Sequence, residues 1–129
     1  MVIGGGYTGL SAAYHLANQG ADVGLIEAAR FGDGASGRNG GQFGTGRRIW
    51  AEDHEKQCGF ERSKALFEVA EEAKTYLLGF AREHNIDMEY MPGQISAVHK
   101  PRYLKNYQDH AELMATRFNY PRIRYVERD

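Results

Sequence analysis

MVIGGGYTGLSAAYHLANQGADVGLIE, residues 1–27, is the stretch that decides the fold predicted for this chain. A short apolar run over residues 1–3 enters a glycine-rich turn, a helix is predicted over Gly9–Asn18, and a second strand follows over residues 22–26. Gly4, Gly6 and Gly9 have the GxGxxG spacing, which suits a tight turn, close approach of a pyrophosphate, and close helix–strand packing. We therefore predict a βαβ unit that binds a dinucleotide at the N-terminus of its helix.

The context of these glycines strengthens the prediction, since a lone GxGxxG can arise by chance in a glycine-rich chain. Apolar residues with helical or strand periodicity are expected to pack between the elements: Ala13, Leu16, Ala17, Val23 and Leu25. Gly20 supplies a helix stop. Glu27 follows the second strand about twenty residues after the glycines, where a carboxylate can accept hydrogen bonds from ribose hydroxyls. The alternative is a strand–helix turn that binds no ligand.

Composition favours a globular, water-soluble protein of one domain or less. The 129 residues are 42% hydrophobic and 26% charged, with a net charge of -1, which gives no reason to invoke nucleic acid or a membrane surface. No apolar run approaches the ~20 residues that span a bilayer. A single cysteine, Cys58, suits a reducing compartment, so a cytoplasmic location is expected. Because only one βαβ unit is recognisable, we interpret the chain as the N-terminal portion of a larger protein.

A second glycine-rich stretch covers residues 32–46 and cannot hold a regular helix or strand. One interpretation is a flexible linker. The other, which we prefer, is a second cofactor loop, because Arg38, Asn39, Gln42 and Phe43 are interleaved with the glycines. Arg38, with Arg47 and Arg48 beyond it, would add positive charge near phosphates.

The remainder of the chain predicts an α/β segment inserted after the βαβ unit. Helices are predicted over residues 51–58, 60–84 and 101–118, and strands over residues 94–99 and 123–126. The apolar stripe expected on the second helix contains Leu66, Val69, Ala70, Ala73, Tyr76, Leu77 and Phe80. The stripe expected on the third contains Leu104, Tyr107, Ala111, Met114 and Phe118.

No residue of the chain is a convincing acid, base, nucleophile or metal ligand. The five histidines form no HExxH pair, no second cysteine accompanies Cys58, and no serine has the GxSxG context. We therefore predict no metal site. If a bound cofactor carries the reaction, the protein needs only to bind, orient and tune it.

Two runs carry a resemblance to a known family: VIGGGYTGLSAA at residues 2–13 and GASGRNGGQ at residues 34–42. They resemble the FAD-dependent oxidoreductases of the D-amino-acid-oxidase-like (DAO) superfamily. Within it, IDMEYMPGQ at residues 86–94 and HKPRYL at residues 99–104 are most similar to gamma-glutamylputrescine oxidoreductases, which oxidise an amine carbon with FAD and pass electrons to oxygen. The resemblance implies an FAD/NAD(P)-binding, Rossmann-like α/β fold that is incomplete here.

The resemblance also implies a division of the chain and a set of FAD-binding residues. Residues 1–50 would be the start of the FAD-binding domain, and residues 51–129 an inserted segment that begins the substrate domain. The residues implied to contact FAD are Gly4, Gly6, Tyr7, Thr8, Gly9, Glu27, Ala28, Arg30, Ser36, Gly37, Arg38, Asn39, Gly40 and Gly41. The substrate would be a small amine or amino acid, and the electron acceptor oxygen. The resemblance assigns no catalytic residue.

Three hypotheses follow. The chain is the FAD-binding start of an amine or amino-acid oxidase, or part of an NAD-dependent dehydrogenase, or a non-catalytic nucleotide-binding fragment. The second glycine stretch counts against the dehydrogenase, whose domain would continue to a helix and a third strand. The anionic Glu27 should disfavour a 2′-phosphate, and hence NADP. We also expect residues 35–42 to be mobile or irregular without FAD, because they offer little apolar surface to bury.

Overall fold

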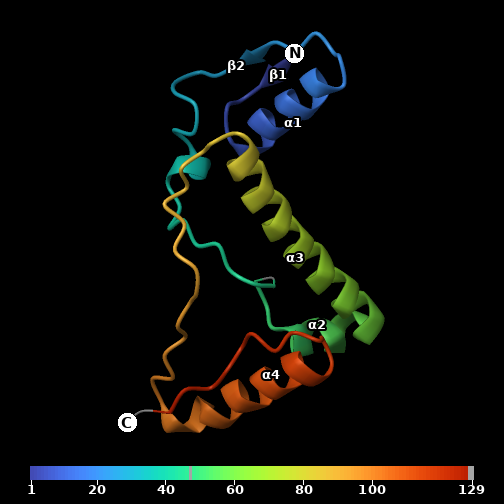
Figure 1. Ribbon diagram of the computed structural model, residues 1–129, viewed down its shortest axis with the longest axis vertical. Coiled ribbons are helices and arrows are strands. Elements are labelled where there is room, and N and C mark those ends of the chain that lie inside the picture. Colours follow the sequence, from blue (N-terminus) through green and yellow to red (C-terminus); the bar gives the residue numbers. More distant parts are fainter. Residues whose placement is uncertain (47, 128–129) are drawn as a thin grey trace. The chain divides into compact units, whose positions relative to one another are not determined.

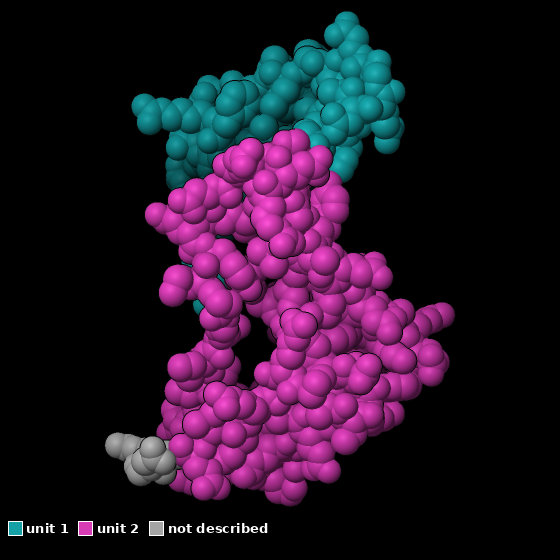
Figure 2. Space-filling model, viewed as in Figure 1, with its two compact units in different colours: residues 1–42 teal, residues 43–129 magenta. Residues whose placement is uncertain are grey.

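The computed structural model of the chain describes residues 1–46 and 48–127 (Figure 1). Its regular elements are β1 (Val2–Ile3), α1 (Tyr7–Asn18), β2 (Leu25–Ile26), η1 (Ala35–Gly37), α2 (Ala51–Cys58), α3 (Phe60–Glu83), η2 (Pro101–Tyr103) and α4 (Leu104–Thr116). The described residues thus form a mainly helical chain with one small parallel sheet. They divide into two compact units, unit 1 over Met1–Gln42 and unit 2 over Phe43–Asp129 (Figure 2).

Unit 1 is a strand–helix–strand arrangement. β1 and β2 pair in parallel, with Val2 opposite Leu25 and Ile3 opposite Ile26. Bonds from the Val2 N–H to the Gly24 carbonyl (2.7 Å) and from the Gly4 N–H to the Ile26 carbonyl (2.8 Å) extend the ladder at both ends. The second strand is shorter than predicted, and α1 begins two residues before the predicted start.

Unit 1 buries very little side-chain surface. Gly5 is its only buried residue among those that the structure describes. Val23, two residues before β2, and Leu25 within it are half-buried, and Ile26 is exposed, as the predicted alternation requires. The predicted packing face of α1 is wrong in part, because Leu16 is 43% exposed and Ala17 is exposed as well. A sheet of two short strands is too small to cover the whole face of a twelve-residue helix.

Unit 2 is built around aromatic contacts between α3 and the segment that follows α4. Phe67, Met114 and Phe118 form the buried core, with exposures of 2–8%. The Phe118 ring meets those of Phe60 and Phe67 edge-on at 5.6 and 5.7 Å, a favourable aromatic geometry. The predicted apolar stripe of the third helix is confirmed, since its five residues are all buried or half-buried.

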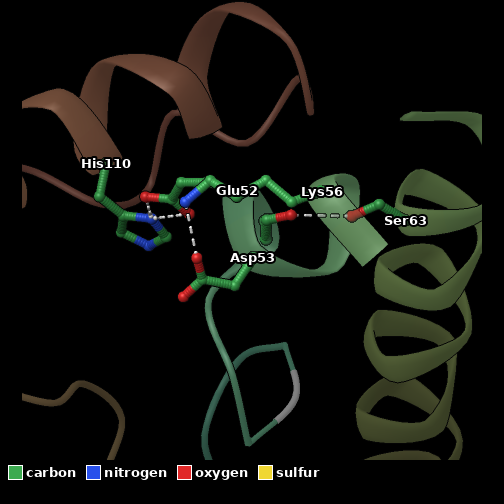
Figure 3. Close-up of polar contacts among 6 residues, drawn as sticks. Glu52, Asp53, Lys56, Ser63 and His110 are labelled. Carbon is green, nitrogen blue, oxygen red and sulfur yellow. Dashed lines mark hydrogen bonds and ion pairs between the residues drawn. The ribbon is translucent and has the colours of Figure 1, made fainter. Parts of the chain in front are cut away.

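Polar contacts fasten α2 to its two neighbours (Figure 3). The Ser63 hydroxyl of α3, only 2% exposed, donates to the Ala51 carbonyl at 3.0 Å. On the other side, His110 Nδ1 of α4 lies 2.9 Å from both carboxylate oxygens of Glu52. A second pair forms where Arg117, the residue after α4, donates to Glu55 of α2 at 2.8 Å.

Gly59 separates α2 from α3. Its φ of +81° is strained for a residue with a Cβ but not for glycine. One residue with this backbone conformation therefore separates the end of α2 from the start of α3. The helix bounds over residues 51–58 agree with the prediction, and α3 ends one residue early. None of the described helices combines the length and apolar character needed to cross a membrane.

Two strands predicted for unit 2 are absent from the described residues, and one predicted helix stripe is wrong in part. Residues 94–99 and 123–126 are not strands: a strand needs a partner to accept and donate its backbone bonds, and the only pairing among the described residues is that of β1 with β2. The segment is therefore helical and irregular, not α/β, in its described part. The apolar stripe predicted for α3 is wrong in part. Leu66, Ala70 and Phe80 are half-buried, but Val69 and Tyr76 are each 54% exposed. The buried residues of α3 lie outside the predicted stripe: Ser63, Phe67 and Ala81.

Candidate functional site

The Glu27 carboxylate lies against the glycine-rich turn. Glu27 follows β2 directly, and its Oε2 accepts a 2.6 Å hydrogen bond from the Gly5 N–H. Its Oε1 accepts a second bond, at 3.0 Å, from the Ala29 N–H. These donors, Gly5 first and Ala29 next, stabilise the ionised form and lower the pKa of the carboxyl below its usual value. The predicted position of Glu27, on the same edge of the sheet as the Gly4–Gly9 turn, is confirmed.

Gly5 is the centre of this turn, although the GxGxxG motif leaves its identity open. Its N–H binds Glu27, its carbonyl accepts the Gly32 N–H at 2.9 Å, and a Cβ built on it would overlap the Phe31 ring. Gly5 thereby joins the first turn to the beginning of the second glycine-rich stretch. Sequence reasoning missed both Gly5 and Phe31. The run of three consecutive glycines was the available signal.

Steric constraints explain why glycine occupies two of the motif positions, Gly4 and Gly9. Gly4 has a φ of +101°, a region that residues with a side chain rarely adopt. A Cβ on Gly9 would overlap the carbonyl oxygen of Gly4, so only glycine lets the first turn of α1 approach the end of β1 this closely. The close packing predicted for Gly9 is therefore present.

The N-terminus of α1 is capped by a distant residue. Gly6, at the N-cap position, has no side chain, and the Tyr7 N–H instead donates to the Ser36 hydroxyl at 2.9 Å. The N–H groups of Thr8 and Gly9 have no protein acceptor among the described residues. Such groups, together with the partial positive charge of the helix end, suit an anionic ligand.

Asn39 closes the loop that contains Ser36. Its Nδ2 donates to the Ser36 carbonyl at 2.8 Å and to the Tyr7 hydroxyl at 3.3 Å, and its Oδ1 accepts the Gly41 N–H at 2.9 Å. The loop is irregular apart from η1, and Gly37 within it has no room for a Cβ beside the Gly32 carbonyl. The structure thus brings residues of both glycine-rich stretches together at the start of α1.

Other predicted residues do not join these contacts through their side chains. Ala28, Arg30 and Arg38 are exposed, as are Gly40 and Arg48. A Cβ added at Gly40 would meet no atom within 4 Å, so this backbone is open to an approaching group. Arg47, which was expected to add positive charge near phosphates, lies outside the described residues.

The chemistry of these groups fits a nucleotide with hydroxyls and phosphates. An ionised carboxylate can accept from hydroxyl groups, while free N–H groups at a helix end can donate to phosphate oxygens. Unit 1 thus holds groups that could bind and orient such a ligand.

Comparison with known proteins matches this chain to one family model and to curated relatives. The family model described as FAD dependent oxidoreductase (DAO) matches residues 1–129. A probable oxidoreductase OrdL of Rhizobium meliloti (strain 1021) is 56% identical over 128 residues, which are 99% of this chain and 30% of that protein. The gamma-glutamylputrescine oxidoreductase of Escherichia coli (strain K12) is 37% identical over 111 residues, 86% of this chain and 26% of that protein.

The chain thus spans under a third of the length of these curated relatives. No solved structure matches it significantly.

Proposed function

Because this chain belongs to the DAO family of FAD-dependent oxidoreductases, we propose that it forms the first part of the FAD site of such an enzyme. The observation that carries the proposal is the contact between Glu27 and the Gly5 N–H. It supports the proposal because Glu27, the expected ribose acceptor, contacts the turn that is expected to meet the pyrophosphate. In this proposal residues 1–50 are the beginning of a Rossmann-like FAD-binding domain, and residues 51–129 begin the substrate domain.

The residues proposed to contact FAD keep the roles that the resemblance implies. The first turn would meet the pyrophosphate, Glu27 the adenosine ribose, and the backbone around Ala28 and Arg30 the adenine side. The second loop would lie along the pyrophosphate and the flavin. These residues are Gly4, Gly6, Tyr7, Thr8, Gly9, Glu27, Ala28, Arg30, Ser36, Gly37, Arg38, Asn39, Gly40 and Gly41. The open N–H groups of Thr8 and Gly9 support the pyrophosphate assignment.

The reaction proposed is oxidation of the C–N bond of a small amine or amino acid. Bound FAD would supply the hydride acceptor, and oxygen would regenerate it. The part of this chain is to hold the dinucleotide end of the cofactor. Glu27 would fix the ribose through its hydroxyls and would repel a 2′-phosphate, which favours FAD over NADP. The name of the Escherichia coli relative supports an amine substrate of the gamma-glutamylputrescine type.

The lone Cys58 supports a cytoplasmic location for the protein.

The test is to purify the full-length protein and to measure its visible absorption. We expect a yellow protein with a flavin spectrum that bleaches when an amine of the substrate panel is added without oxygen. Glu27→Ala should lose FAD during purification, whereas Asp22→Ala, which removes an exposed carboxylate from the same unit, should retain it. A colourless wild-type protein that binds no added FAD would refute the proposal. Retention of FAD by the Glu27 variant would refute the ribose role alone.

A further inference from the structure

The first turn of α1 obtains its cap from another part of the chain. A helix usually receives its capping oxygen from the N-cap side chain, but Gly6 has none. Ser36, twenty-nine residues from Tyr7, supplies the oxygen, which lies 2.9 Å from the Tyr7 nitrogen. A Cβ on Gly6 would come within 2.9 Å of the same hydroxyl oxygen. Glycine at the N-cap position therefore makes room for the serine of the second loop.

Asn39 makes the placement of Ser36 depend on the whole loop. One amide side chain bonds to Ser36 and Ala35 on one side of the turn, to Gly41 on the other, and to the Tyr7 hydroxyl on α1. Both the amide nitrogen and the amide oxygen are thus engaged within the protein. We call the group formed by Tyr7, Ser36 and Asn39 the clasp.

The loop has little else to hold its shape. Backbone bonds at 3.2 Å from Gly37 to Gly34, and at 3.3 Å from Arg38 to Ala35, form the three-residue η1. The stretch offers almost no apolar side chain to bury, so its conformational entropy must be offset by specific hydrogen bonds. The clasp supplies several of these bonds and directs them to the helix end where a pyrophosphate is proposed to bind.

We propose that Ser36 and Asn39 are positioning residues, which act on FAD through the geometry of the second loop and not as separate side-chain ligands. The inference rests on the proposed function, because it concerns the same cofactor. It changes the expected behaviour of the two residues. Substitution of two independent FAD ligands gives additive losses of binding free energy. Substitution of two members of one clasp does not, since the loss of either side chain already releases the loop.

The test is a double-mutant cycle in the full-length apoprotein, titrated with FAD and followed by quenching of flavin fluorescence. We expect Ser36→Ala and Asn39→Ala each to raise the Kd for FAD about tenfold, in the range of one lost hydrogen bond. The double variant should be no more than about twofold weaker than the weaker single variant. Ser36→Thr, which keeps the hydroxyl, should restore most of the affinity. Ser11→Ala, which removes an exposed hydroxyl from α1, is the matched control and should bind as the wild type does.

A second measurement tests the hydrogen bonds of the clasp in the absence of FAD. Amide hydrogen exchange at Tyr7 in the apoprotein should be faster in Ser36→Ala and also in Asn39→Ala, although Asn39 does not bind that N–H. Additive losses near a hundredfold in the double variant, or a Tyr7 amide unchanged by Asn39→Ala, would overturn the inference. Failure of the proposed function has a different signature: the wild type would bind no FAD, while the Tyr7 amide would still report on the clasp.

Discussion

At the scale of single residues, Gly5 and Gly9 exclude a side chain for different reasons. A Cβ on Gly9 would overlap backbone, the Gly4 carbonyl, while a Cβ on Gly5 would overlap a side chain, the Phe31 ring. Backbone in a turn cannot move aside, whereas Phe31 is 61% exposed and can rotate away. Movement of Phe31 can therefore relieve the clash that alanine makes at position 5, whereas no such movement relieves the clash at position 9.

We expect Gly9→Ala to lower the free energy of unfolding by about 2 kcal/mol or more, and Gly5→Ala by about 1–2 kcal/mol. Replacing Phe31 by alanine in the Gly5→Ala background should recover most of the loss. Gly24→Ala is the control, since its Cβ meets no atom within 4 Å, and it should be nearly neutral. Urea midpoints of the purified variants measure these differences. A Gly5→Ala loss that Phe31→Ala does not relieve would show that the ring is not the obstacle.

Glu27 should make the stability of unit 1 depend on pH. Its pKa in the folded protein is lowered from 4.5, first by the Gly5 N–H, so folding favours the ionised form. The stabilisation is complete above an unfolded-state pKa of about 4.5 and is lost as pH falls through the lower folded-state pKa.

The variant Glu27→Gln keeps an acceptor oxygen and removes the charge. The difference in thermal midpoint between wild type and Glu27→Gln should be greatest near neutral pH and should shrink below about pH 4.5. Asp22→Asn, a neutral replacement of an exposed carboxylate in the same unit, should give a difference that changes far less with pH. If the Glu27 difference is constant from about pH 7 to about pH 3, the bond to Gly5 does not depend on charge.

At the scale of elements, α4 is joined to α2 through His110, within the helix, and through Arg117, which directly follows its last residue. His110 has only 17% of its side chain exposed, and its ring also packs on Trp50 at 4.7 Å. By contrast, Lys105 and Asp109 form an exposed pair within α4, with 80% and 57% of their side chains accessible. Partly buried contacts between elements contribute more to stability than exposed pairs within one helix.

His110→Ala should therefore lower the free energy of unfolding by about 1–2 kcal/mol, whereas Lys105→Ala should change it by less than about 0.5 kcal/mol. Trp50 fluorescence during urea unfolding is a suitable measurement, because Trp50 is the single tryptophan of these 129 residues and contacts the altered ring. Equal effects of the two substitutions would mean that His110 and Glu52 do not hold α2 and α4 together.

Local signals predicted the helices well and the strands poorly, for a physical reason. Gly59 marks the break between α2 and α3, and helical bonds connect residues only four positions apart, so short windows contain the needed information. A strand at residues 94–99 needs a partner from elsewhere in the chain, which no local pattern reports. The buried side of α3 could not be chosen either, because both of its faces carry apolar residues such as Phe67 and Val69.

For the candidate site, the same distinction separates what was predictable from what was not. Glu27 was found because motif spacing fixes where the carboxylate falls relative to the glycines. The roles of Gly5, Phe31 and Asn39 depend in part on contacts between residues 22 or more positions apart, or on filling of space, and neither is encoded in a spacing rule. Phe31, as an exposed aromatic residue next to the second stretch, gave no periodic signal at all.

At the scale of the whole molecule, the two units differ in what holds them together. Unit 2 has an aromatic core around Phe67 and Phe118. In unit 1, Gly5 is the only buried residue among those described, and hydrogen bonds to Glu27, Ser36 and Asn39 provide much of the cohesion. Hydrogen bonds each add modest net stability in water, so we expect unit 1 to be the less stable of the two units.

The burial of a single glycine in unit 1 also has a calorimetric consequence. The heat-capacity increment of unfolding and the sensitivity to urea both scale with newly exposed surface, and unit 1 has little to expose. It should melt over a broad temperature range, with a shallow urea dependence, and open sub-globally before the rest of the chain. A ligand present at a hundredfold excess over its Kd would add about 2.7 kcal/mol to the free energy of unfolding of unit 1. Bound ligand would then account for a large part of the stability of unit 1.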